Sequence, residues 1–184
     1  MVDLALLQSV SYIAGALGLC VAAIYYVMNI RETSKNRRAT LTTNLVQNLA
    51  QQDSVRTWFK VLIETRWKDL DDFKSKYDSR VNPENFIQRV DIWTKCELVG
   101  YQFRSGLIDI DTVYALFGDF MINTWAMYKP IIEYYRKNGD FSDDYLVNYE
   151  YLAKALTKMK SERAPNSMAL TPFGKDKLEV VLKS

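Results

Sequence analysis

Histidine is absent from this 184-residue sequence. Its absence excludes histidine-based acid–base catalysis, Ser-His-Asp and Cys-His catalytic arrangements, and metal sites that contain histidine. Cysteine is scarce as well: Cys20 and Cys96 fall in separate predicted helices and are not expected to pair. A single thiol outside the first helix is typical of a reducing cytoplasm.

Proline and glycine are also few, with four and seven residues. Most of them stand near the ends of predicted helices, as at Pro83, Gly106 and Gly139. No segment alternates polar and apolar residues convincingly enough to predict a strand, and we find no internal repeat. The sequence therefore predicts an all-α fold, with one N-terminal transmembrane helix followed by a cytoplasmic bundle of about five helices.

An excess of basic charge is missing from most of the chain, whose net charge is only +2. Asp3 contributes −1 and residues 31–38 contribute +3, so residues 39–184 are neutral overall. A general nucleic-acid role is therefore disfavoured, because phosphate binding needs basic excess. The basic residues of this flank are Arg31, Lys35, Arg37 and Arg38.

Residues 4–30 form a long run without a charged side chain, and the basic flank follows at once. A bilayer core about 30 Å thick needs about 20 apolar helical residues, so this run is long enough to cross it. Tyr12 lies near one end and Tyr25 and Tyr26 near the other, at the depth that tyrosine prefers. We predict a transmembrane anchor at residues 1–30 and a juxtamembrane flank at residues 31–38; the alternative is a buried core helix.

A cleaved signal peptide is a second alternative for this run. Such a peptide needs a basic start and a small-residue cleavage site, whereas this sequence begins Met-Val-Asp, and Leu19 before Cys20 disfavours a lipoprotein. We therefore expect an uncleaved anchor. The positive-inside rule then predicts a single-pass protein of the cell membrane, with its N-terminus outside and its domain in the cytoplasm. The basic flank is expected to contact anionic lipid headgroups.

Small residues recur on one face of the predicted span, with Ala14, Gly18 and Ala22 four residues apart. This spacing lets two membrane helices approach closely, so we expect contact with another protein or with a second copy. The alternative is that glycine and alanine are simply common in membrane helices. The candidate packing residues are Ser11, Ala14, Gly15, Gly18 and Ala22.

Amphipathic patterns over residues 39–163 predict the helical domain, and residues 164–184 are expected to form a loosely ordered tail with a short helix near 175–182. The predicted helices begin with residues 39–52, which continue the anchor, and a segment that Asp53 and Ser54 can cap. The next helices cover 69–77 and, with Asn82 as the N-cap, Pro83 to about Ser105. Another runs from Asp109 or Asp111 through Pro130 to Asn138, and Ser142 caps a last helix.

Glu97 is the most unusual charge of the domain, since it shares an apolar helix face with Trp93 and Gly100. A carboxylate there is costly unless it is paired or hydrogen-bonded. It is either a functional acid at a binding site or a structural partner in a helix–helix contact that Gly100 permits. We favour the structural interpretation, in which Glu97→Gln costs little stability.

Other candidate chemistry is weak. The aspartate groups near residues 69–72, 109–111 and 140–144 stand at predicted helix starts, where capping explains them, and none has the calcium-loop pattern. We expect no metal, no cofactor and no catalytic residue. Whether the chain is an enzyme stays uncertain, although no nucleophile–base pair is visible.

Two segments carry a family resemblance: Cys96 to Gly100, and Ser105 to Gly118. Together with Trp67 and the segment holding Trp125, Tyr128, Pro130 and Ile131, they resemble an uncharacterised prokaryotic family. The resemblance covers roughly residues 4–163 and implies one N-terminal span and a soluble all-helical domain, with no assigned activity. Usual members have another aromatic residue at the position of Cys96, and the 164–184 tail is extra.

The sequence thus predicts a membrane-anchored helical interaction or scaffold domain of unknown specific role, such as an accessory subunit. The first alternative is a membrane-tethered sensory or signalling module that binds a small ligand. The second is a membrane-tethered enzyme without a recognisable site. The expected partners are the lipid bilayer and another protein, or a second copy through the membrane helix.

Overall fold

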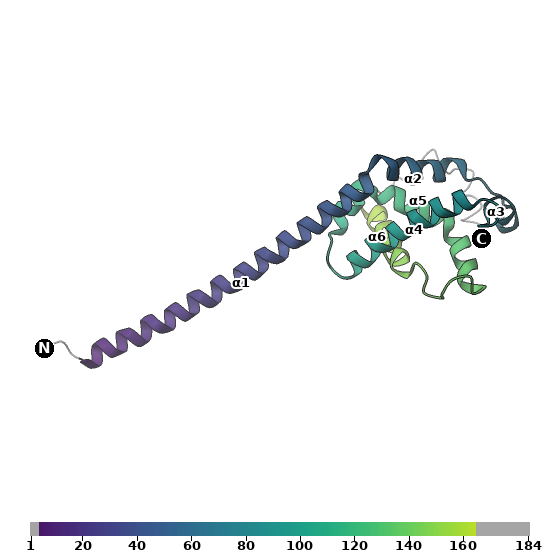
Figure 1. Cartoon of the computed structure of the whole chain (residues 1–184). Helices are drawn as coiled ribbons and strands as arrows, with labels where there is room; N and C mark the ends of the chain where they lie inside the picture. Colours follow the sequence, from purple (N-terminus) through teal and green to yellow (C-terminus); the bar gives the residue numbers. More distant parts are fainter. Residues whose placement is uncertain (1–3, 165–184) are drawn as a thin grey trace. The chain divides into compact units, whose positions relative to one another are not determined.

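The computed structural model describes residues 4–164, and these residues form six helices and no strand. The all-α prediction is therefore confirmed for this part of the chain, while residues 165–184 of the predicted tail lie outside it. The helices are α1 (Leu4–Ala50), α2 (Gln52–Glu64), α3 (Leu70–Tyr77), α4 (Pro83–Arg104), α5 (Ile110–Lys137) and α6 (Val147–Arg163) (Figure 1).

Helix α1 runs without interruption through the apolar run, the basic flank and the first predicted helix of the domain. Neither proline nor a glycine after Gly18 interrupts it. The chain divides into two compact units at Thr40, so the last turns of α1 belong to the second unit. There Leu45 and Leu49 are buried, which ties these turns to the core of the domain.

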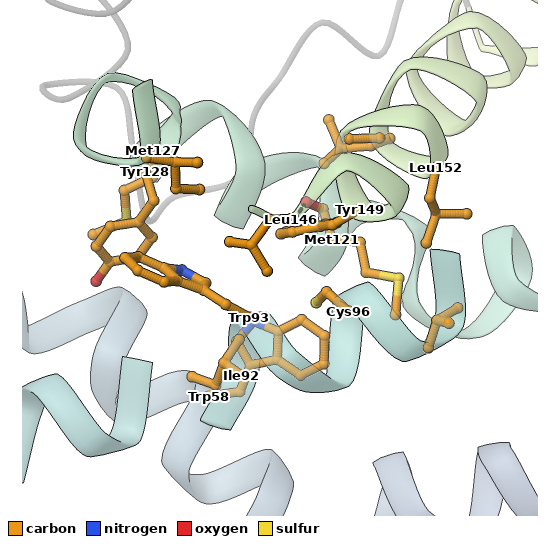
Figure 2. Packing of buried hydrophobic residues seen from close by; sticks show 14 of the residues in the cluster. Trp58, Ile92, Trp93, Cys96, Met121, Met127, Tyr128, Leu146, Tyr149 and Leu152 are labelled. Atoms are coloured by element: carbon orange, nitrogen blue, oxygen red, sulfur yellow. Dashed lines mark hydrogen bonds between the residues drawn. The ribbon is translucent and has the colours of Figure 1, made fainter. Parts of the chain in front are cut away.

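The core of the second unit is built largely from aromatic and long aliphatic side chains of α2, α4, α5 and α6 (Figure 2). Trp93 of α4 is fully buried, and its ring meets the ring of Tyr128 of α5 edge to face at 5.3 Å. Trp125 of α5 meets Tyr149 of α6 in the same manner at 5.1 Å. Each fully buried large apolar side chain stabilises the fold by roughly 1.5–3 kcal/mol.

Two buried polar side chains of this core, Trp58 and Tyr149, have partners on other helices. The Trp58 indole N–H of α2 donates to the Thr124 hydroxyl of α5 at 2.7 Å. The Tyr149 hydroxyl of α6 donates to the Met121 carbonyl of α5, also at 2.7 Å. Since an unpaired buried donor costs about 1–3 kcal/mol, these bonds fix how α2 and α6 pack on α5.

Three helix starts follow the predicted caps. The side chain of Asp69 accepts from the Asp72 N–H at the start of α3, Asn82 caps α4 ahead of Pro83, and Asp109 caps α5 through the Thr112 N–H. Helix α5 continues past Pro130, as predicted. These starts are local, because each capping side chain reaches an N–H three residues ahead.

Two other predicted starts are wrong. Helix α2 begins at Gln52, so Asp53 and Ser54 lie in its first turn and do not cap it. Helix α6 begins at Val147, five residues after the predicted cap Ser142, whose hydroxyl bonds to the Asp144 carboxylate instead. Residues 142–146 form a turn that ends at Leu146, a buried residue with a left-handed φ of 62°.

Candidate functional site

Glu97 of α4 is half-buried against the N-terminus of α6. Its Oε2 accepts the backbone N–H of Tyr149 at 2.7 Å, and its Oε1 accepts the Asn148 backbone N–H at 3.3 Å and the Asn148 side-chain amide at 2.7 Å. The first N–H groups of a helix have no partner within it. Glu97 supplies that partner from another helix, and its negative charge lies at the positive end of the α6 dipole.

The Glu97 contact needs Gly100, which lies one turn further along α4. A Cβ at position 100 would stand 2.2 Å from the carbonyl oxygen of Asn148 and 2.8 Å from the Tyr149 nitrogen. These are backbone atoms, which cannot move aside as a flexible side chain can. Glycine therefore allows α4 and α6 to meet closely enough for the Glu97 carboxylate to reach the α6 terminus.

Arg89 of α4 is fully buried and is not among the site residues predicted from the sequence. Its Nη1 donates to the Tyr77 carbonyl at 3.0 Å and to Asn85 Oδ1 at 2.7 Å, and its Nη2 donates to the Tyr135 hydroxyl at 3.4 Å. The guanidinium also lies 4.7 Å from the centre of the Phe73 ring. Within residues 4–164 no carboxylate forms an ion pair with it, so polar groups and aromatic faces stabilise the cation.

The charge of Arg89 is costly to bury, and burial lowers the pKa of Arg89 from its ordinary value. The side chain connects the end of α3, at Tyr77, with α4 and α5. The sequence does hold a signal for its position, because Arg89 stands three residues after Phe86 and four before Trp93, on the apolar stripe of the helix.

Cys96 of α4 is part of the hydrophobic core. It is fully buried, and burial raises the pKa of its thiol to about 12. The thiol therefore stays protonated at neutral pH and is a poor nucleophile. Its position suits packing against Tyr149 rather than catalysis.

An open groove of about 950 Å³ lies between α5 and α6. Trp125, Ala126, Pro130 and Ala153 form its apolar part, and Tyr134, Thr157 and Ser161 add hydroxyl groups. Its remaining lining residues are charged: Lys129, Glu133, Lys137, Glu150, Lys154 and Lys158.

The acidic residues of the groove are already paired. Glu150 accepts from Arg136 at 2.8 Å and from Lys154 at 2.7 Å, and Glu133 lies 3.7 Å from Lys129. With four lysines and two glutamates, the lining has a net charge of +2. The groove is therefore an electropositive, partly apolar surface.

The remaining sequence-predicted residues lie along α1. The candidate packing residues Ser11, Ala14, Gly15, Gly18 and Ala22 are exposed, and a Cβ at Gly15 or Gly18 would meet nothing within 4 Å. Arg31, Lys35, Arg37 and Arg38 are exposed as well. By length and composition, α1 holds the one segment among residues 4–164 that is long and apolar enough to cross a membrane, a property that it shares with signal sequences.

The predicted aspartate groups lie apart from this groove lining. Asp69 and Asp109 act as helix caps, and the Asp72 carboxylate accepts from the Lys68 N–H and the Lys76 ammonium. No group of three or more metal-ligating side chains occurs in the part of the chain that the structure describes.

Comparison with known proteins gives a family but no characterised relative. The family described as Domain of unknown function (DUF4760) matches residues 12–156, a stretch that begins within α1 and ends within α6. No curated protein and no solved structure matches the chain. The expectation of an uncharacterised family is thereby confirmed. Because the match spans well over half of the sequence, this protein belongs to the DUF4760 family.

Proposed function

We propose that this protein is a single-pass membrane protein whose helical domain lies in the cytoplasm and binds another protein. The observation that carries the proposal is the apolar part of α1. Residues 4–30 are uncharged and span about 40 Å at roughly 1.5 Å per residue, more than the bilayer core of about 30 Å. Their exposed side chains need an apolar surrounding that water does not supply.

The orientation of the anchor follows from its flank. Arg31, Lys35, Arg37 and Arg38 directly follow the apolar run, and basic residues near a membrane helix stay on the cytoplasmic side. The same residues suit anionic headgroups, each with roughly 1 kcal/mol of attraction. The resemblance to a prokaryotic family makes a bacterial inner membrane the natural host for a test.

Topology is tested with two reporters fused after Ser184, one active only in the cytoplasm and one only in the periplasm. We expect the cytoplasmic reporter to be active and alkaline carbonate to leave the protein in the membrane fraction. The matched control changes all four basic residues of the flank to glutamine, which should increase the fraction with the opposite orientation. Release into the soluble fraction would favour a signal sequence, and a periplasmic signal would contradict the orientation.

The interaction role is supported by the open, electropositive α5–α6 groove. Residues 39–184 are neutral overall, which favours a protein over a nucleic acid as the partner. Purification of the full chain from membranes in mild detergent tests this role. A protein partner in a fixed stoichiometric ratio would support it. A retained small molecule without a protein partner would instead favour the sensory alternative.

A further inference from the structure

We infer that the groove between α5 and α6 binds an acidic amphipathic helix of a partner protein. The inference rests on the proposed interaction function and names the chemistry of the partner. Three features of the groove support it: its length along two neighbouring helices, its small apolar floor, and the arrangement of its lysines.

The groove has the length and form that a helix needs. Its walls are residues 125–137 of α5 and 150–161 of α6, each about 18 Å long at roughly 1.5 Å per residue. Arg136 pairs with Glu150 at one end of the helix pair, and Asp119 pairs with Lys160 at the other, so α5 and α6 run in opposite directions. A third helix in the valley between two such helices completes a bundle, whereas small ligands prefer more enclosed cavities.

The apolar part of the groove is made of small or flat side chains. Ala153 is buried, Ala126 and Trp125 are half-buried, and Pro130 is exposed. Alanine and proline leave room for leucine-sized side chains of an incoming helix to approach the backbone. Pro130 has no N–H to donate to the Ala126 carbonyl, so one of the acceptors of this wall lacks its usual helical donor. A partner with apolar residues on one face fits this floor.

The charges of the groove select an acidic partner. On α5 the wall places Lys129, Glu133 and Lys137 four residues apart, and on α6 it places Glu150, Lys154 and Lys158 at the same spacing. This spacing puts each set along one ridge of its helix.

Two of these lysines, Lys137 and Lys158, lack a close ion pair with an acidic residue among the described residues. Lys137 has no acidic partner among the described residues, and Lys158 only approaches the exposed Glu162, at 3.9 Å. Because α5 and α6 are antiparallel, Lys137 and Lys158 lie towards opposite ends of the groove. A bound helix with glutamate or aspartate near both of its ends would pair with both lysines.

The test uses the full-length protein in nanodiscs of zwitterionic phosphatidylcholine. The probe is a fluorescein-labelled peptide of about 18 residues with leucines at helical i, i+3, i+4 spacing and glutamates beside them. Two matched peptides serve as controls. In one, lysine replaces every glutamate, and in the other, serine replaces every leucine. Fluorescence anisotropy should show saturable binding of the acidic leucine peptide, and each matched peptide should bind at least roughly tenfold more weakly.

Variants locate the binding site. Lys137→Glu combined with Lys158→Glu should weaken binding of the acidic peptide by roughly tenfold, because two attractive contacts become repulsive. Arg56→Glu combined with Arg80→Glu removes the same charge from exposed positions outside the groove and should leave binding within about twofold. Ala126→Phe fills the floor and should also weaken binding. Tryptophan fluorescence melts confirm that each variant is folded.

Three outcomes would overturn the inference. They are equal binding of the acidic and basic peptides, equal weakening of binding by the groove pair and the control pair of variants, and competition by phosphatidylglycerol vesicles that displaces the peptide from the groove lysines. The last result would assign the surface to lipid headgroups. If peptide binding fails while the chain stays in membranes with a stoichiometric protein partner, the groove assignment is wrong and the proposed function stands.

Discussion

Glu97 of α4 accepts the backbone N–H of Tyr149 of α6 at 2.7 Å, although the two residues are 52 positions apart in the chain. This bond makes a carboxylate of one helix the N-terminal cap of another. The other carboxylate oxygen of Glu97 accepts from Asn148, so both oxygens of the side chain form hydrogen bonds. The geometry changes the expectation that Glu97→Gln costs little, because an amide has only one accepting oxygen.

The first prediction follows from this contact. Glu97→Gln places an amide N–H₂ against a backbone donor and removes a negative charge from the α6 N-terminus. We expect a loss of about 1–3 kcal/mol in the free energy of unfolding. Tryptophan fluorescence is a suitable measurement, because α1 contains no tryptophan. The signal therefore reports the domain, which holds Trp58, Trp67, Trp93 and Trp125.

Glu162→Gln is the control for the Glu97 variant. Glu162 is exposed and lies 3.9 Å from Lys158, so its loss should change stability by less than about 0.5 kcal/mol. If both variants unfold like the wild type, Glu97 does not stabilise α6. A stable Glu97→Gln protein that loses partner binding would instead restore the functional interpretation.

The second prediction concerns Gly100. Gly100→Ala should destabilise the domain by about 1–3 kcal/mol, because its Cβ would meet the Asn148 carbonyl at 2.2 Å and force α4 away from α6. Gly118→Ala is the matched control, since its Cβ would meet only the Tyr114 side chain, at 3.0 Å. Equal melting temperatures for the two variants would show that α4 and α6 can separate without cost.

The third prediction concerns Arg89. Arg89→Lys keeps the charge but loses the planar fork that bonds Tyr77, Asn85 and Tyr135 together. We expect a loss of about 1–3 kcal/mol, measured by urea unfolding in detergent. Arg80→Lys, at an exposed turn position, should have no measurable effect. A wild-type unfolding midpoint for Arg89→Lys would mean that the buried cation needs no fixed geometry.

The fourth prediction is a pH dependence. Hydrogen bonds from Lys154 and Arg136 lower the pKa of Glu150 below its ordinary value of 4.5, against an opposing effect of burial. The folded state therefore favours the ionised carboxylate more than the unfolded state does. The stabilisation that results is fully present above pH 4.5 and is lost as the pH falls through the lowered pKa.

Glu150→Gln tests this dependence. The melting temperature of the wild type should exceed that of Glu150→Gln at pH 7, and the difference should shrink as the pH falls below 4.5. Because both proteins contain the other carboxylates, comparing their melting temperatures at each pH cancels the contribution of those groups to the pH dependence. A difference that stays constant from pH 7 to strongly acidic conditions would contradict the role of the Lys154 and Arg136 contacts.

The fifth prediction concerns the exposed small-residue face of α1. Gly18→Ile should reduce self-association of the membrane helix, measured with a transcriptional reporter of helix dimerisation, because a large side chain keeps two backbones apart. Leu19→Ile is the control on a different face of the helix. Equal reporter signals for both variants and the wild type would show that this face does not carry self-association.

Local sequence accounts for much of this fold. The all-α class follows from periodicity and from few prolines and glycines, and the starts of α3, α4 and α5 follow from Asp69, Asn82 and Asp109. Each of these signals acts over three or four residues, so a reader of the sequence can find it. The length and lack of charge of residues 4–30 are likewise properties of the sequence alone.

Only the tertiary structure decided the contacts between residues that are far apart in the sequence. Helix α6 begins at Val147 rather than after Ser142, with its first N–H groups bonded to Glu97 of α4, about fifty residues away. Arg89 needs acceptors and rings from other elements to stay charged inside the core. The α5–α6 groove exists only because the two helices pack side by side. Such contacts are set by packing in three dimensions, which the spacing of residues along one helix does not encode.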